Sequence, residues 1–353
     1  MRFVILHEAG GPEGVAGSPQ RYAETITEAR RAEEVGFHCI ALSEQHFNKT
    51  DSTISAPETL FGALSVLTDT VRLRFASVVL LPFNHPLRII ERVATLDILS
   101  GGRIEVGTAR SNNPGTLASF GVDPKMTRDY WSEAFSIVRQ GLTHGSVEFH
   151  GEHWDIPATH ILPRAVQEPC PPLHVSATSM ETHRIAGTLG VGVMTGNSLP
   201  GGWDYMEEAM AVYEEGRASM GAGEDVLTDS RGALALVAHC AESAETAREE
   251  ASDHASTFVD MVAGWYQRLA ASSDDYSELG PLREVVDRRH DLEFLVDRSP
   301  YLSIGTPDFF LERCQRLTDL GYDEFILRID GINHDAHMRT IDLLGKHVIP
   351  AMS

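Results

Sequence analysis

Two neighbouring stretches carry the clearest fold signal of the sequence: Leu80-Leu81-Pro82-Phe83-Asn84-His85-Pro86-Leu87-Arg88 and Leu96-Asp97-Ile98-Leu99-Ser100-Gly101-Gly102-Arg103. The apolar run from Leu73 to Leu81 is typical of a buried strand, and it is closed by a proline. His85-Pro86 then opens a helix, because proline is favoured at the first helical position. That helix ends at two glycines, which allow the positive φ angles of a helix stop. The next apolar run, Ile104 to Thr108, predicts a second strand, so the stretch is a strand–helix–strand unit.

The same alternation continues along the whole chain. Strands are predicted at Arg2 to His7, Cys39 to Leu42, Arg72 to Leu81, Ile104 to Thr108, Leu173 to Ala177, Gly192 to Thr195, Gly232 to His239 and Glu324 to Ile329. Helices are predicted at Ser18 to Val35, from Ser55, at Arg128 to Leu142, Met180 to Leu189, Tyr205 to Met220, Ala244 to Phe258, Pro307 to Leu320 and Ala336 to Val348. Eight strands with intervening helices favour a parallel α/β barrel of the (β/α)8 TIM type, formed as a single domain over residues 1–353.

Composition excludes several classes of partner. The formal net charge of −22 repels polyphosphate and anionic lipid, so we expect neither nucleic acid nor a membrane surface as partner. The sequence has no run of 18 apolar residues, and the N-terminal segment MRFVILHEAG is too short for a signal peptide. The 4 cysteines are isolated in the sequence, which favours reduced, buried thiols. These features predict a cytoplasmic protein.

The opening stretch resembles the signature of the bacterial luciferase-like family of flavin-dependent monooxygenases. The similarity extends to SEQHF (Ser43 to Phe47), PPLHVSATSMET (Pro171 to Thr182) and SIGTPDFF (Ser303 to Phe310), and thus runs nearly end to end. The resemblance implies a TIM barrel that binds reduced FMN, supplied by a separate flavin reductase, together with dioxygen. One oxygen atom is then inserted into an organic substrate and the other leaves as water. It also implies a homodimer, here through Pro57 to Leu67 and Pro86 to Leu99.

Two segments interrupt the alternation. Residues Gly145 to Pro163 hold two short runs around Gly151 and predict a surface hairpin. Residues Ala271 to Ser303 are charged and irregular, and a long excursion of this kind in a compact barrel is usually functional or disordered. Because the family carries a mobile active-site loop in this region, we expect a lid there.

A phosphate site is predicted at the C-terminal ends of the strands, where barrel enzymes carry their chemistry. Arg110 follows the fourth strand, while Ser179 and Thr182 offer hydroxyls beside the free backbone donors of a helix start. For Ser179 a plain helix N-cap is the structural alternative. The resemblance assigns these three positions to the FMN phosphate, with Thr178 at a place where the luciferase α subunit has a glutamate.

The resemblance also implies a cofactor contact on the third strand. In luciferase a non-proline cis peptide near the end of this strand packs beneath the flavin ring. Counting back from Leu81-Pro82 places its equivalent at Ser77-Val78, two residues that from sequence alone belong to a core strand.

Candidate catalytic residues follow the first three strands. Glu44-Gln45-His46-Phe47 stands where luciferase has Glu-His-His-Phe, whose first histidine is its acid/base. Gln45 cannot titrate, so it can only form hydrogen bonds. His7, His46 and His85 end the first three strands and are candidates for proton transfer, and the sequence does not choose among them. Since Thr116 and Ala109 also replace a luciferase aspartate and cysteine, light-emitting aldehyde chemistry is not expected.

The predicted pocket rim is apolar, with Phe47, Phe83, Leu117, Phe120 and Met194, which favours a hydrophobic or aromatic substrate, as found in secondary metabolism and antibiotic biosynthesis. Three other functions stay open. They are a dehydrogenase or reductase that uses flavin or deazaflavin on the same barrel, a non-catalytic FMN-binding protein, and a metal-dependent hydrolase. The His/Glu patterns at 148–153 and 334–337 lack a third ligand in fixed spacing, so no metal is predicted.

Overall fold

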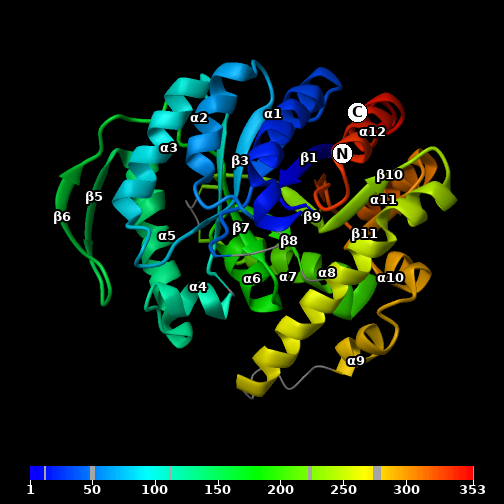
Figure 1. Cartoon of the computed structure of the whole chain (residues 1–353). Coiled ribbons are helices and arrows are strands. Elements are labelled where there is room, and N and C mark those ends of the chain that lie inside the picture. Colours follow the sequence, from blue (N-terminus) through cyan, green and yellow to red (C-terminus); the bar gives the residue numbers. More distant parts are fainter. Residues whose placement is uncertain are drawn as a thin grey trace.

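The computed structural model describes residues 1–11, 13–47, 52–111, 113–196, 198–221, 225–272 and 280–352. Its centre is a closed barrel of eight parallel strands in the order β1-β12-β9-β8-β7-β4-β3-β2 (Figure 1). These strands are β1 (Arg2–His7), β2 (Cys39–Leu42), β3 (Arg72–Val79), β4 (Ile104–Ala109), β7 (Leu173–Ala177), β8 (Gly192–Thr195), β9 (Arg231–Ala235) and β12 (Glu324–Arg328). The predicted TIM barrel is therefore confirmed.

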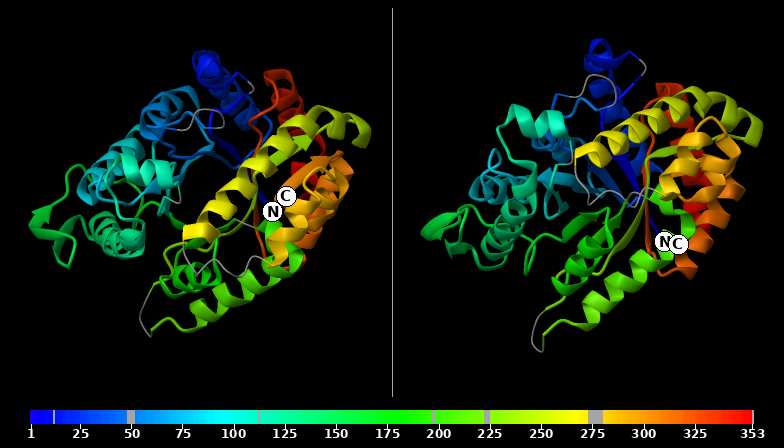
Figure 2. Two further views of the ribbon diagram at one scale, coloured as in Figure 1. Left: turned by 60° about the horizontal axis from the view of Figure 1, so that its bottom comes forward. Right: turned by 90° about the horizontal axis from the view of Figure 1, so that it is seen from below.

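Helices lie around the barrel between successive strands. They are α1 (Ser18–Glu34), α2 (Pro57–Leu67), α3 (Pro86–Ser100), α4 (Pro114–Ser119), α5 (Thr127–His144), α6 (Met180–Thr188), α7 (Ser198–Ala218), α8 (Ala244–Ser272), α9 (Gly280–Asp287), α10 (Leu292–Arg298), α11 (Pro307–Asp319), α12 (His334–Leu343) and α13 (Ile349–Met352). In both views of Figure 2 the long helix α8 lies beside α9 and α10. The two ends of the chain meet, since the amino group of Met1 donates to the carbonyl of Met352 at 3.0 Å.

The opening stretch of the sequence folds as predicted. Helix α3 starts after His85, whose Nδ1 accepts a hydrogen bond from the amide of Leu87 at 3.2 Å. It stops at Gly101, which has φ +66°, a conformation that glycine adopts without strain. The strand on each side of α3 then lies in the barrel, and β3 pairs with β4.

Alternation along each strand decides which side chains fill the barrel. On β1, Val4 and Leu6 point inward and pack with Met194 and Ile326, while Phe3 and Ile5 point outward into the core beneath the helices. The amino-terminal end of the barrel is filled by a buried ion network instead. There Arg74 pairs with Glu105 and Glu324, and Nε2 of His174 lies 3.2 Å from Oε2 of Glu105.

The predicted strand Gly232 to His239 is wrong in one respect, because it is two strands. The barrel strand β9 ends at Ala235, and β10 (Val237–Cys240) pairs with β11 (Leu302–Gly305) outside the barrel. The amides of Leu236 and Val237 both donate to the carbonyl of Tyr301, at 2.9 and 3.2 Å, which turns the chain away.

The predicted irregular excursion at Ala271 to Ser303 is also wrong in its described part. Helix α8 continues to Ser272, far beyond the predicted end at Phe258, and α9, α10 and β11 follow. Residues 273–279 of this segment, and with them part of the expected lid, lie outside the described residues. The other interruption matches its prediction, because β5 (Ser146–His150) and β6 (Asp155–His160) form an antiparallel hairpin.

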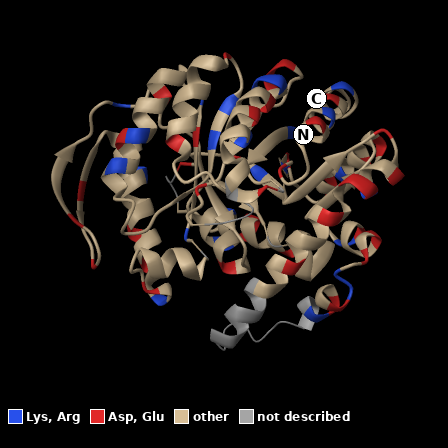
Figure 3. Ribbon diagram, viewed as in Figure 1, with Lys and Arg blue, Asp and Glu red and all other residues tan. Residues whose placement is uncertain are grey.

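Positions with Lys or Arg and positions with Asp or Glu are both spread along the outer helices of the ribbon (Figure 3). Among the residues that the structure describes, no helix combines the length and apolar character that crossing a membrane requires.

Candidate active site at the C-terminal end of the barrel

Glu44 joins the ends of two neighbouring strands. It follows β2, is almost completely buried, and accepts hydrogen bonds from the amide of Val79 at 2.8 Å and from Nδ2 of Asn84 at 2.6 Å. Its Oε1 also lies 2.9 Å from Nε2 of His46. Three donors around one carboxylate fix the loop after β2 against the loop after β3. Asn84 in this network had no assigned role in the sequence analysis, although it lies within the opening stretch.

His46 lies among aromatic rings at the mouth of the barrel. Its ring centroid is 5.5 Å from that of Phe83 and 5.1 Å from that of Phe120, and these two phenyl rings stack at 4.0 Å. The hydroxyl of Thr116 donates to the His46 carbonyl at 3.1 Å. The predicted rim residues Phe47, Phe83 and Phe120 thus gather around one histidine, with Phe47 the most exposed of them.

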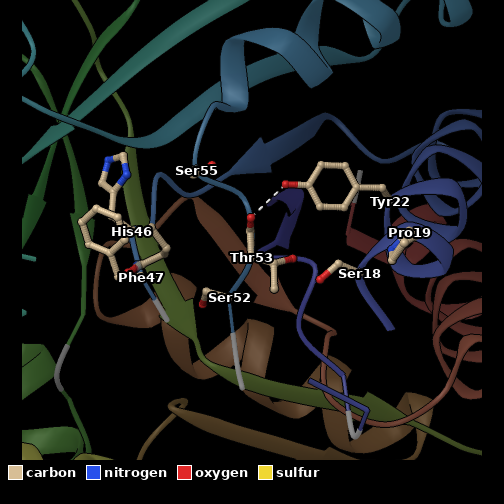
Figure 4. A pocket seen from close by; sticks show the side chains of 9 residues that line it. Ser18, Pro19, Tyr22, His46, Phe47, Ser52, Thr53 and Ser55 are labelled. Atoms are coloured by element: carbon tan, nitrogen blue, oxygen red, sulfur yellow. Dashed lines mark hydrogen bonds between the residues drawn. The ribbon is translucent and has the colours of Figure 1, made fainter. Parts of the chain in front are cut away.

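A pocket of about 620 Å³ opens beside His46. Figure 4 shows His46 and Phe47 on one side of it and Tyr22 of α1 on the other, with the Tyr22 hydroxyl donating to the carbonyl of Thr53 at 2.8 Å. The lining residues are Ser18, Pro19, Tyr22, Gln45, His46, Phe47, Ser52, Thr53 and Ser55. Helix α1 was not part of the predicted site, because its contribution depends on how it packs against the loop after β2.

The non-proline cis peptide lies one residue earlier than predicted, at Ala76-Ser77 instead of Ser77-Val78. The same place is irregular in the sheet, because the pairing of β3 with β4 shifts register between Phe75 and Val78. Ser77 and Val78 are both buried, and the carbonyl of Ser77 accepts a hydrogen bond from the amide of Glu44 at 3.2 Å.

Helix α6 begins at this same end of the barrel, directly after β7. Ser179 is its N-cap: its Oγ accepts from the amide of Thr182 at 3.4 Å and lies 3.0 Å from the Thr182 hydroxyl. The amides of Met180 and Glu181 have no acceptor within the helix, because the first amides of any helix lack one. Together these donors form an anion-binding helix start.

Two arginines stand near this helix start. Since Thr108 of β4 pairs with Val175 of β7, Arg110 follows β4 alongside the end of β7, next to the exposed Thr178. Arg128 of α5 is 2.9 Å from the carboxylate of Glu181. Hydroxyls, free amides and a guanidinium are the donor set that a phosphate monoester needs, so these residues fit the phosphate of FMN.

Beneath the helix start, His183 is completely buried and holds α6 to the barrel. Its Nδ1 lies 2.8 Å from the carbonyl of Ser179, and its Nε2 lies 3.1 Å from the hydroxyl of Thr195 on β8. Burial lowers the pKa of His183 to about 4, so the ring is neutral at neutral pH. The sequence analysis missed this residue, although its position four residues after Ser179 places it on the next turn of the helix.

Two of the candidate histidines are not brought to this site. His7 is the outward residue that follows Leu6 on β1, and its Nδ1 lies 3.5 Å from Glu28 and 3.6 Å from Asp330 in a buried cluster beneath α1 and α12. His85 caps α3, and its ring packs against Trp154 of the hairpin at 5.0 Å. Of the predicted catalytic residues, the structure gathers Glu44, Gln45 and His46.

Comparisons with known proteins identify the family to which these features point. Residues 1–324 match the model of the family described as luciferase-like monooxygenase. The uncharacterized protein y4wF of Sinorhizobium fredii (strain NBRC 101917 / NGR234) is 32% identical over 174 residues, which span 49% of this chain and 50% of that protein. The oxygenase component of the flavin-dependent trigonelline monooxygenase of Acinetobacter baylyi (strain ATCC 33305 / BD413 / ADP1) is 25% identical over 363 residues, covering 100% of this chain and 96% of that protein.

Two solved structures share the fold along nearly their whole length. The oxygenating constituent of 3,6-diketocamphane monooxygenase from Pseudomonas putida, in complex with FMN, superposes with a TM-score of 0.77 at 19% identity and covers 99% of this chain and 98% of its own. The coenzyme F420 dependent tetrahydromethanopterin reductase from Methanopyrus kandleri gives a TM-score of 0.73 at 20% identity, with 100% and 99% covered. At such identities the likeness concerns the fold alone.

Proposed function

The chain belongs to the family of luciferase-like monooxygenases and is an oxidoreductase of that family, and from this premise we propose that it is the oxygenase of a two-component system. It receives reduced FMN from a separate reductase and inserts one atom of dioxygen into a hydrophobic or aromatic substrate. When bound, reduced FMN supplies the two electrons with which the other oxygen atom becomes water. The oxygenase-component name of the trigonelline relative supports this division of labour.

The observation that carries the proposal is the helix start at α6. The hydroxyls of Ser179 and Thr182 lie 3.0 Å apart, and Arg110 follows the neighbouring strand β4 at the same end of the barrel. Thr178 and the buried Ser77 and Val78 complete the proposed FMN site. When FMN binds, Ser179, Thr182 and Arg110 would hold its phosphate, and Ser77 and Val78 would contact its ring.

Proton handling falls to the residues after β2. Glu44 holds Nε2 of His46 at 2.9 Å, and the aromatic rings around His46 limit the access of water to it. Gln45 lines the same pocket and can orient the substrate or the flavin through its amide. His46 is therefore the group that we propose moves a proton, while Glu44 positions it.

A deazaflavin-dependent reductase is the second candidate, because the F420 dependent structure shares the fold. A phosphate site at α6 serves either cofactor, so the two candidates differ in their reaction with dioxygen. A metal-dependent hydrolase is disfavoured by the charges present. In the described part of the chain, Glu24, Glu28 and His334 have metal-compatible spacing, but Arg21 already pairs with both carboxylates, at 2.6 Å from Glu24 and 3.1 Å from Glu28, and its positive charge opposes a cation there.

The test mixes the protein with reduced FMN under anaerobic conditions and then adds dioxygen, while the flavin absorbance is followed. We expect the protein to bind reduced FMN and to change the rate of its reoxidation relative to free reduced FMN. Ser179→Asp keeps a helix cap but places a carboxylate against the phosphate, so it should abolish this effect. The matched control is Ser243→Asp at the start of α8, where Ser243 accepts from the amide of Thr246 at 3.1 Å.

The outcome decides between the candidates. Reduced F420 that binds in preference to reduced FMN, with no oxygen consumption, would favour the reductase. Reoxidation that is unchanged by the wild-type protein would contradict both the FMN site and the oxygenase assignment. We also propose a cytoplasmic location, which is consistent with 4 reduced, buried cysteines.

A further inference from the structure

The pocket beside His46 is lined by side chains that mostly accept hydrogen bonds. The hydroxyl of Tyr22 already donates to the carbonyl of Thr53 at 2.8 Å. The hydroxyl of Ser52 donates to the carboxylate of Glu8 at 2.8 Å, and that of Thr53 donates to the carbonyl of Ala9 at 3.0 Å. A hydroxyl has one hydrogen and two lone pairs, so these three oxygens can offer only lone pairs to a ligand.

The side chains that follow β2 also offer hydrogen-bond acceptors to the pocket. Glu44 accepts from Val79 and Asn84, as an ionised carboxylate does, so His46 must donate to it through Nε2–H. In the neutral ring Nδ1 is then left as an acceptor. Nε2 of Gln45 donates one hydrogen to the hydroxyl of Ser43 at 3.1 Å, which leaves its Oε1 as a further acceptor and its second N–H as a donor.

Among the described residues that line the pocket there is no lysine, arginine, aspartate or glutamate. It also offers aromatic faces, namely Tyr22 on one side and His46 with the 65% exposed Phe47 on the other. A carboxylate placed here would meet no positively charged side chain among the described lining residues, and the hydroxyls of Tyr22, Ser52 and Thr53 could not donate to it, so its burial would be costly. A planar aromatic group with a hydroxyl matches both the faces and the acceptors.

We propose that this pocket binds an uncharged phenol, whose hydroxyl donates to Nδ1 of His46. This inference rests on the proposed monooxygenase function and specifies its substrate class. The pocket volume of about 620 Å³ has room for more than one ring.

The same contact gives His46 a chemical task. As Nδ1 takes the phenolic proton, the oxygen becomes negative and the ring becomes richer in electrons, which favours attack on an electrophilic oxygen atom. Glu44, 2.9 Å from Nε2, stabilises the resulting imidazolium. The balanced reaction converts the phenol, dioxygen and reduced FMN to a hydroxylated phenol, water and oxidised FMN. One C–H bond is replaced by C–OH, and reduced FMN is the two-electron donor.

Binding can be tested without flavin. The probes are 2-naphthol, its methyl ether 2-methoxynaphthalene, which cannot donate, and 2-naphthoate, which is anionic. We expect 2-naphthol to bind at least tenfold more tightly than either analogue, as measured by fluorescence titration. As the pH is raised, the absorption band of 2-naphthol shifts to that of the naphtholate. We expect this shift to occur at a lower pH for the bound compound than for the free compound.

Two variants assign the effect to named residues. His46→Asn keeps a polar side chain but cannot take a proton, so it should remove the spectral shift; the matched control is His150→Asn on the exposed hairpin. Phe47→Ala alters an exposed side chain and should weaken 2-naphthol and its methyl ether alike, through lost stacking. Far-UV circular dichroism spectra that match the wild type will show that both variants are folded.

The inference is overturned if 2-methoxynaphthalene binds as tightly as 2-naphthol, if 2-naphthol fails to bind, or if His46→Asn leaves the spectral shift unchanged. It is also overturned if Phe47→Ala weakens FMN binding as much as naphthol binding, because the pocket would then hold the flavin ring. None of these results depends on oxygen transfer, so they are separate from a failure of the reduced-FMN experiment.

Discussion

The ring nitrogen Nδ1 of His183 lies 2.8 Å from the carbonyl oxygen of Ser179, the residue that caps the same helix. A carbonyl only accepts, so Nδ1 carries the hydrogen and Nε2 accepts from the hydroxyl of Thr195 at 3.1 Å. The neutral ring therefore ties the start of α6 to β8. A protonated ring would place two N–H groups here and lose the acceptor that Thr195 uses.

Acid should weaken the fold through this histidine. Burial lowers the pKa of His183 to about 4, whereas the unfolded chain binds the proton near the ordinary value of 6.5. Stability is therefore present above about pH 6.5 and is lost as the pH falls toward 4, by about 2–3 kcal/mol at pH 4.5. Urea unfolding at pH 7 and pH 4.5 should show a smaller loss for His183→Gln than for the wild type.

Two comparisons complete this test. The control His150→Gln changes an exposed histidine of the hairpin and should lose as much stability between pH 7 and pH 4.5 as the wild type. His254, whose pKa burial lowers to about 3, should retain part of the pH dependence in every variant. Equal pH dependence in His183→Gln and the wild type would contradict the assigned role.

The proposed phosphate contact predicts a selective loss of FMN affinity. Arg110→Ala removes a fixed charge beside α6 and should weaken FMN binding by about 2–4 kcal/mol, as expected for a charge-assisted contact. Riboflavin has no phosphate, so its affinity should change little. Isothermal titration with both compounds measures the difference. Arg88→Ala, an exposed arginine on α3 that pairs with Glu91, is the matched control. If the wild type binds FMN and riboflavin equally well, the phosphate is held elsewhere.

Position 45 should show its role in the pH profile of turnover. Gln45→Ala removes a hydrogen-bonding side chain from the pocket, so it should slow turnover without removing an ionisation. Gln45→His should add an ionisation near pH 6–7, the usual range of histidine. The rate measured between pH 5 and 9 distinguishes the variants. A Gln45→His profile that superimposes on the wild-type profile would mean that position 45 does not face the reacting centre.

The barrel could be predicted from the sequence because strand and helix patterns are local, and the positions of Arg110 and Ser179 just after strands could be read in the same way, while their role toward the phosphate stays a prediction. It could not place His7. The segment from Arg2 to His7 is apolar on both faces, so only the packed barrel shows that Val4 and Leu6 face inward and His7 faces α1. The pairing of Arg74 with Glu324 was equally out of reach, since 250 residues separate them.

The exposed ends of α2 and α3 predict a homodimer. The apolar residues on which the dimer prediction depends are Leu60, Phe61, Leu64, Leu67, Leu87, Ile89, Ile90 and Val93. Leu67 is 44% exposed and Leu87 is half-buried, but the other six are buried within the chain itself. The unpaired apolar surface lies at the helix ends instead, where Val66 is 73% and Leu99 is 52% exposed. Helices α2 and α3 pack against each other, and we propose that their exposed apolar ends form the dimer interface.

Light scattering tests this surface. We expect a dimeric mass for the wild type at micromolar concentration, and a monomeric mass for Val66→Glu/Leu99→Glu, because two buried carboxylates would be unpaired in the interface. Val226→Glu changes an exposed apolar residue away from these helices and should leave the dimer intact. A monomeric wild type would contradict the proposed assembly.

The last prediction is that NADH or NADPH cannot replace the separate reductase. Hydride transfer to the flavin requires a held nicotinamide dinucleotide, and dinucleotide sites commonly use a glycine-rich turn after a strand. Gly190 and Gly192, at the start of β8, have structural roles instead. Gly190 has φ +66°, and a Cβ on Gly192 would lie 2.5 Å from Nδ1 of His174. Purified protein with FMN, NADH or NADPH and dioxygen should therefore consume oxygen only when an unrelated flavin reductase is added. A parallel reaction that contains the reductase and the Ser179→Asp variant, in place of the wild type, measures the oxygen consumption caused by free reduced FMN. Flavin reduction at an equal rate without the reductase would mean that the chain binds a nicotinamide itself, and the two-component assignment would be wrong.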